Sequence, residues 1–96
     1  MSYIPNVSTF LVFYRFKTMT NEEARKAKDE WNQIRNNLPS TIELVGEYSH
    51  AWGTKYNGFL LFEADNAESF LDWWTTFKST IRWYVMETHT IVARRK

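Results

Sequence analysis

The chain has 96 residues, a length at which a single domain spanning residues 1–96 is expected. Twelve Lys and Arg residues against eleven Asp and Glu residues give a formal charge of +1, which lacks the strong field that attracts nucleic acid or an anionic membrane. The absence of Cys excludes disulfides, thiolate metal sites and Cys nucleophiles. The N-terminal segment has no basic start followed by a long apolar run, so a cytoplasmic protein without a membrane partner is expected.

Residues 9–16 are predicted to form the first strand. This segment is almost entirely apolar and rich in aromatic and β-branched residues, a pattern typical of a central strand covered on both faces. A helix is predicted to follow, because Thr20 and Glu23 fit a capping box. Pro39 should end this helix. Its narrow apolar stripe consists of Ala24, Ala27, Trp31, Ile34 and Leu38.

The second half of the chain repeats the order strand, helix, strand. Residues 41–52 and 56–63 are predicted to form a hairpin, in which Gly46 and Gly58 mark bulges or close backbone approaches. A second capping box over residues 65–68 predicts another helix, and residues 81–94 read as the last strand. The apolar face of this helix consists of Ala67, Phe70, Leu71, Trp74 and Phe77, with Trp73 at its edge. The whole pattern predicts an α+β fold of order βαββαβ, an antiparallel sheet with two helices on one face.

In such a sheet the first and third strands are expected to lie side by side at the centre, so their side chains can be compared face by face. One face suits packing against helices and carries Phe10, Val12, Tyr14, Phe16, Gly58, Leu60 and Phe62. The other face mixes apolar rings with charge and carries Leu11, Phe13, Arg15, Asn57, Phe59, Leu61 and Glu63. We assign a cavity to this second face, although a slip of one residue in register would exchange the two faces.

The outer strands are predicted to add polar groups to the second face. These are Glu43, Glu47 and Ser49 from the second strand, and either Glu87 and His89 or Tyr84 and Met86 from the last. Arg15 would stand among several of these Glu residues, where it could form a buried ion pair, anchor a ligand carboxylate or set the protonation of one Glu. The alternative is a structural salt bridge at a subunit interface. Both interpretations stay open.

Histidine is the side chain that ordinarily titrates near neutrality, so a general base is first sought at His50 and His89. With Arg15 they are the catalytic candidates, and the alternative is that each His is a surface or interface residue. Two isolated His residues do not have the spacing of a metal pair, so neither a metal nor a cofactor is expected.

Aromatic residues make up 18% of the chain, more than a one-layer core usually needs. Tyr48, Trp52 and Tyr56 cluster around the hairpin, where they could wall a pocket for a flat molecule or form the centre of a dimer contact. The candidate ligand-binding residues are therefore Arg15, Glu47, Tyr48, Trp52, Phe59 and Glu63.

Three segments carry a resemblance to a known superfamily: residues 10–17, residues 58–65 and residues 68–74, followed by a closing strand. They resemble the dimeric α/β-barrel superfamily, ferredoxin-like domains whose sheets pack face to face across a homodimer, and most of all its short, functionally uncharacterised members. The resemblance implies an obligate homodimer with a cavity either between sheet and helices or between the two sheets. Its relatives include cofactor-free monooxygenases, isomerases, decarboxylases and haem-binding enzymes, as well as proteins without known chemistry.

The resulting functional hypothesis is a homodimer that binds a small aromatic or flat organic molecule, as a cofactor-free monooxygenase or isomerase-like enzyme. The alternative is a non-catalytic ligand-binding or protein-interaction module. A third hypothesis is an RNA-recognition motif, because residues 55–62 partly follow its third-strand pattern and Phe13 could stand beside Phe59. Asn57 occupies a stacking position, however, and glutamates on the same face would repel phosphate, so no nucleic acid partner is expected.

Overall fold

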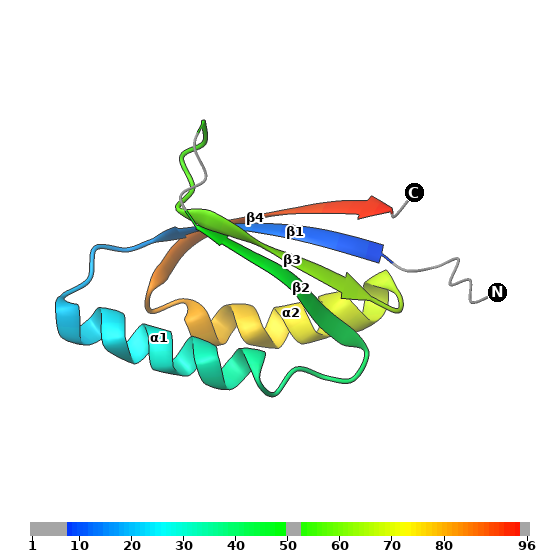
Figure 1. The fold of residues 1–96 in the computed structure, drawn as a ribbon, viewed down its shortest axis with the longest axis horizontal. Coiled ribbons are helices and arrows are strands. Elements are labelled where there is room, and N and C mark those ends of the chain that lie inside the picture. Colours follow the sequence, from blue (N-terminus) through cyan, green and yellow to red (C-terminus); the bar gives the residue numbers. More distant parts are fainter. Residues whose placement is uncertain (1–7, 50–52, 95–96) are drawn as a thin grey trace.

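The computed structural model describes residues 8–49 and 53–94. Its elements are β1 (Ser8–Phe16), α1 (Asn21–Arg35), β2 (Ile42–Ser49), β3 (Gly58–Ala64), α2 (Ala67–Ile81) and β4 (Val85–Arg94). The four strands form one antiparallel sheet in the order β2-β3-β1-β4, with both helices on the same face (Figure 1). The predicted α+β class, the order βαββαβ and the central position of β1 and β3 are confirmed.

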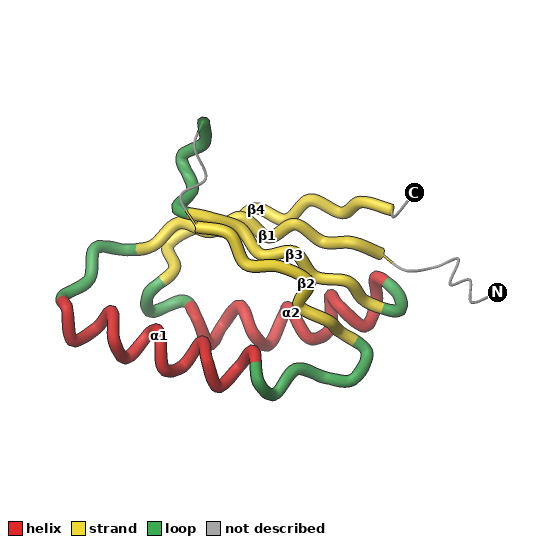
Figure 2. The backbone as a smooth tube through the Cα atoms, in the orientation of Figure 1, coloured by secondary structure: helices red, strands yellow, loops and turns green. Residues whose placement is uncertain are grey.

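The molecule has two layers, a sheet and a pair of helices, as Figure 2 shows. In that view residues 53–57, which lead into β3, project on the side of the sheet away from the helices. We call the sheet face away from the helices the open face; its residues include Leu11, Phe13, Arg15, Phe59, Leu61, Glu63, Glu87, His89 and Ile91. No helix in the described ranges has the length and apolar character needed to span a membrane.

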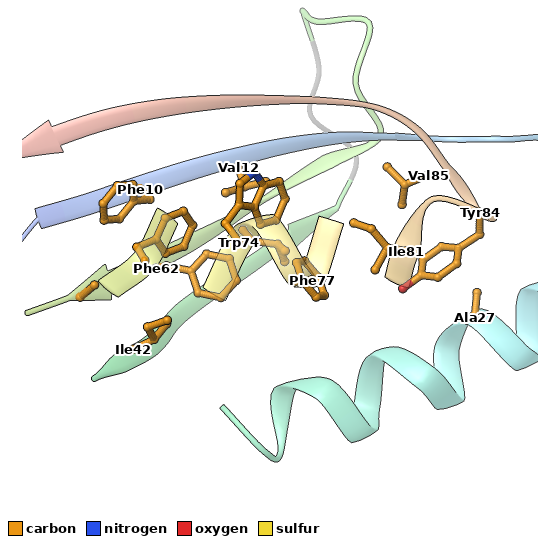
Figure 3. Close-up of a cluster of buried hydrophobic side chains, with 13 residues drawn as sticks. Phe10, Val12, Ala27, Ile42, Phe62, Trp74, Phe77, Ile81, Tyr84 and Val85 are labelled. Carbon is orange, nitrogen blue, oxygen red and sulfur yellow. The ribbon is translucent and has the colours of Figure 1, made fainter. Parts of the chain in front are cut away.

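The core lies between the other face of the sheet and the helices, chiefly α2. Phe10 and Phe70 are fully buried, and their rings stack with centroids 3.9 Å apart. Phe62 is also fully buried against Phe70, at a centroid distance of 5.5 Å. Further along α2, Trp74 and Phe77 continue this row of rings beneath the sheet (Figure 3). Most of the helix-facing set predicted from alternation in β1 and β3 builds the core: Phe10, Val12, Leu60 and Phe62 are buried, whereas Phe16 at the end of β1 is 39% exposed.

Both helices begin at a side-chain cap, but only one cap is where the sequence predicts it. The Glu23 amide donates to the Thr20 hydroxyl at 3.1 Å, and the Glu23 carboxylate accepts from the Thr20 amide at 2.9 Å, which confirms the first capping box. The second box over residues 65–68 is wrong. Asn66 caps α2 instead, accepting a hydrogen bond of 2.8 Å from the Ser69 amide.

Two strand boundaries also differ from the prediction. β3 begins at Gly58, two residues later than expected, and β4 begins at Val85 rather than at residue 81. Ile81 is the last residue of α2, where it is buried as the next member of the apolar stripe of that helix. The expected end of the second strand at residues 50–52 lies outside the described residues.

A β-bulge interrupts β2, as the glycine in this strand suggested. The register with β3 shifts between Leu44 and Gly46. The Tyr48 ring lies over Gly46, because a Cβ atom added there would be 2.7 Å from Tyr48 Cε2. Beyond the bulge, Tyr48 is opposite Phe59 on the open face, and Glu47 is opposite the buried Leu60.

This bulge corrects one prediction about faces. Side chains alternate along a strand, so one extra residue exchanges the faces of every residue after it. Glu43 lies opposite Glu63 on the open face as expected, whereas Glu47 and Ser49 do not join it. Glu47 points to the helix side of the sheet, where it meets α1.

Gly58 marks a close approach, the second role expected of the strand glycines. A Cβ atom at this position would lie 2.2 Å from the Tyr48 carbonyl oxygen and 2.5 Å from the Tyr14 hydroxyl oxygen. The glycine therefore lets the Tyr14 ring lie across β3 on the helix side of the sheet, where it lines the pocket described next.

Candidate ligand pocket

An apolar pocket with a volume of about 300 Å³ lies between the sheet and the two helices. Val12 and Leu60 line it from the central strands. Aromatic rings line it from β1, α1, α2 and the turn before β4: Tyr14, Phe16, Trp31, Trp74, Phe77 and Tyr84. Its volume is at the lower end of the range of small-molecule sites, and its lining has the mixture of rings and few polar groups that such sites share.

The pocket exists because α1 turns small side chains toward the sheet, whereas α2 turns large ones toward it. α2 buries Phe70, Trp74, Phe77 and Ile81, whereas the one fully buried side chain of α1 is Ala27. Ala24 and Ala27 line the pocket, and Figure 3 shows Ala27 on the α1 side of Ile81 and Tyr84. Small side chains on α1 leave space that the large rings of α2 fill elsewhere in the core.

Glu47 attaches α1 to the edge of the sheet beside this pocket. The Trp31 indole nitrogen and the Arg35 guanidinium each donate a hydrogen bond to its carboxylate. Arg35 and Glu47 are partly exposed, so this ion pair contributes modestly to stability. Its structural effect is to fix the Trp31 ring as one wall of the pocket, and it depends on the bulge that turns Glu47 toward the helices.

Two of the residues that line the pocket, Tyr14 and Tyr84, carry a phenol hydroxyl. Burial raises the pKa of Tyr14, and the nearby Glu47 carboxylate raises it further. Burial also raises the pKa of Tyr84 to about 12, with a smaller contribution from Glu30. Both phenols are therefore neutral at physiological pH and can donate hydrogen bonds.

The raised pKa of Tyr84 predicts a loss of stability in alkali. The folded chain keeps this phenol proton up to about pH 12, whereas the unfolded chain releases it near the ordinary value of 10.0. The stability that the protonated Tyr84 phenol contributes is therefore fully present below pH 10 and is lost as the pH rises toward 12. Between these values, wild type should lose about 2 kcal/mol more unfolding free energy than Tyr84→Phe. Urea unfolding of both proteins measures this difference, and equal losses would contradict it.

A row of rings crosses the open face, on the opposite side of the sheet from the pocket. The Tyr48 ring stacks on Phe59 at a centroid distance of 4.7 Å, and Phe59 lies 5.2 Å from Phe13. Tyr56 follows at 5.7 Å from Phe13 and 6.2 Å from His89. The structure thus brings together Tyr48 and Phe59 of the predicted ligand-binding residues, while Trp52 and His50 lie outside the described residues.

Charged groups lie at the two ends of the open face. At one end Glu87 is opposite Arg15, binds Lys55 at 2.6 Å and accepts a hydrogen bond of 3.2 Å from the Tyr56 hydroxyl. The hydrogen bond from Lys55 is the main reason that the pKa of Glu87 is lowered. At the other end are Glu43 and Glu63.

Of the Glu residues expected around Arg15, Glu87 lies opposite it, whereas Glu47 and Glu63 do not. Glu63 lies opposite Thr9, near the start of β1, whereas Arg15 is near its end. Glu47 is on the other side of the sheet. Among the groups proposed from the last strand, Glu87 and His89 lie on the open face, and Tyr84 lines the pocket.

Two of the three catalytic candidates do not reach the described pocket. Arg15 and His89 lie on the open face, and neither lines the pocket. The cavity that the residue pattern assigns to the open face stays a prediction, and the pocket described here lies on the helix side of the sheet. Within residues 8–49 and 53–94, no three acidic or His side chains gather as a metal site would require.

The fold and the site define a small α+β domain with a four-stranded antiparallel sheet and an apolar pocket between sheet and helices. Residues 8–93 match the family described as a domain of unknown function, DUF3303. The chain belongs to this family. No curated protein and no solved structure gives a significant match.

Proposed function

We propose that this protein binds a small aromatic or otherwise flat organic molecule in the pocket between α1, α2 and the sheet. The observation that carries the proposal is the pocket itself, about 300 Å³ of apolar space walled by rings from several elements. Flat rings offer broad contact to such a ligand and lose little conformational entropy when it binds.

The polar groups of the pocket favour binding over catalysis. Its carboxylate, Glu47, already accepts hydrogen bonds from Trp31 and Arg35. The phenols keep their protons at physiological pH, so neither supplies a base. A monooxygenase or isomerase-like reaction is the alternative, and it would need a base brought by the substrate or by residues outside the described ranges.

We also propose that two copies pair through their open faces, as in the dimeric α/β-barrel superfamily that the sequence resembles. Apolar side chains occupy the middle of this face, including Leu11, Phe13, Phe59 and Leu61. A chain of 96 residues buries only a modest share of its apolar surface on folding, and such an interface would bury more of it. In an antiparallel arrangement, the end of one copy that carries Glu43 would face the partner end that carries Arg15, Lys55 and Glu87, whose net charge is positive, and this favours pairing by charge.

Nucleic acid remains excluded from the proposal. Phe13 and Phe59 stand side by side as a base-stacking platform would require. Carboxylates of Glu43, Glu63 and Glu87 nevertheless lie on the same face and would repel phosphate. The absence of a nucleic acid partner stays a prediction.

Blocking the pocket tests the proposed function. Ala24 is exposed and lines the pocket, so Ala24→Trp should fill part of it without disturbing the core. The variant should bind acetonaphthone, a flat two-ring ketone, at least about tenfold more weakly than wild type. Ligand-detected NMR titration measures this affinity.

The matched control is Asp29→Trp, which places the same ring on an exposed position of α1 that does not line the pocket. This variant should bind acetonaphthone as wild type does. Equal affinities in all three proteins would place the binding site elsewhere, and the absence of binding to wild type would refute the proposed function.

A further inference from the structure

The Tyr84 hydroxyl is a polar group without a protein partner inside an apolar pocket. Tyr84 is only 4% exposed, and it lines the pocket. Its backbone is held on both sides, because its amide donates to the Ile81 carbonyl at 3.1 Å and its carbonyl accepts from the Lys17 amide at 2.9 Å. The centroid of its ring lies 4.8 Å from that of Trp83 and 6.4 Å from that of Phe16.

No described residue forms a hydrogen bond with this hydroxyl. In the described part of the chain, no polar side-chain atom is completely enclosed without a partner. The Tyr84 hydroxyl is therefore not completely enclosed, and in Figure 3 it is directed toward the space between α2 and α1. Because no protein group competes for this hydroxyl, a ligand oxygen can accept a hydrogen bond from it inside an apolar pocket, where such a bond is stronger than in water.

We propose that the Tyr84 hydroxyl is the recognition group of the pocket and donates a hydrogen bond to an uncharged oxygen acceptor, such as a carbonyl, on a flat aromatic ligand. This inference rests on the proposed function and names the chemical class of its ligand. The remainder of the ligand would lie among the rings of Trp31, Trp74 and Phe77.

The surrounding charges favour a neutral acceptor over an anion. The Glu30 carboxylate is near enough to raise the pKa of Tyr84, and Glu47 lines the same pocket. The Glu30 carboxylate, and to a lesser degree Glu47, whose charge is partly offset by Arg35, oppose a ligand carboxylate inside the pocket. Lys28, the cation among the lining residues, is exposed to solvent, where its charge is screened.

Tyr14 is the natural comparison, since it is the other tyrosine with a raised pKa that lines the pocket. Its hydroxyl already donates to the Tyr48 carbonyl, at 3.4 Å. A ligand would compete with that bond at Tyr14, whereas it would meet no competing protein group at Tyr84. Tyr84→Phe and Tyr14→Phe therefore form a matched pair, each of which removes one hydroxyl and keeps the ring.

The test compares acetonaphthone with ethylnaphthalene, which has the same shape but lacks the carbonyl, in wild type and in both variants. Tyr84→Phe should lower the affinity for acetonaphthone roughly five- to tenfold, the effect of one lost hydrogen bond, and should not lower the affinity for ethylnaphthalene. Tyr14→Phe should lower the affinity for acetonaphthone clearly less than Tyr84→Phe does, because the Tyr14 hydroxyl already donates to the Tyr48 carbonyl. Naphthoate should bind wild type more weakly than acetonaphthone does.

Thermal unfolding without ligand provides a second measurement. Tyr84→Phe should melt at the same temperature as wild type or higher, because no protein hydrogen bond is lost. A clearly lower melting temperature would mean that the hydroxyl has a structural role and would overturn the inference. So would an unchanged affinity for acetonaphthone in Tyr84→Phe, an equal loss for both probes, or tighter binding of naphthoate. If wild type binds neither acetonaphthone nor ethylnaphthalene, the proposed function fails and this inference fails with it.

Discussion

Replacing Phe70 with Ala should lower the free energy of unfolding by about 3–5 kcal/mol. Phe70 is fully buried at the centre of the ring cluster, stacked on Phe10 at 3.9 Å and in contact with Phe62. Removing its ring leaves a cavity that neighbouring rigid rings cannot close. Urea unfolding at a fixed protein concentration measures the loss, because the stability of a dimer depends on concentration.

The control is Leu71→Ala, at the next position of the same helix. Leu71 is 50% exposed, so its truncation should cost far less than that of Phe70. Similar losses for the two variants would mean that α2 packs on the sheet through a different face from the one described.

Phe59→Asp should raise the dissociation constant of the proposed dimer by at least about hundredfold. Phe59 lies on central strand β3, with Tyr48 and Phe13 packed on either side of it on the open face. In a face-to-face dimer an Asp at this position would be a buried charge without a partner, which costs several kcal/mol. Light scattering across a dilution series measures the dissociation constant.

Leu71→Asp is the matched control, because it introduces the same charge at an exposed position of α2 on the other side of the molecule. It should leave association unchanged. A wild-type chain that is monomeric at all concentrations would refute the dimer, and a stable Phe59→Asp dimer would place the interface away from the open face.

Alternation of apolar residues was sufficient to predict the faces of β1 and β3. The pairs Phe10 with Phe62 and Phe13 with Phe59 lie on the faces expected of them. Both strands are regular along the paired segment, so a period of two assigns each side chain correctly. The edge strand β2 differs because its bulge adds one residue, and the pattern of residues around Gly46 does not state where the register shifts.

The pocket could not be predicted in the same way. Its volume depends on how closely α1 approaches the sheet, and that distance depends on Ala27 and on the attachment of Trp31 to Glu47. Neither contact is local in sequence. Tyr84 was also misplaced, because residues 81–84 were read as strand although Ile81 completes the apolar stripe of α2. The signal that could have found it is the helical spacing of Phe70, Trp74, Phe77 and Ile81.

The most direct test of the proposed function is a crystal structure of the protein grown with acetonaphthone. We predict density for the naphthalene rings between α1, α2 and the sheet, with the carbonyl oxygen within hydrogen-bond distance of the Tyr84 hydroxyl. Density for the ligand on the open face, against Tyr48 and Phe59, would contradict the pocket assignment. So would a closed pocket without ligand in a crystal whose protein binds the ketone in solution.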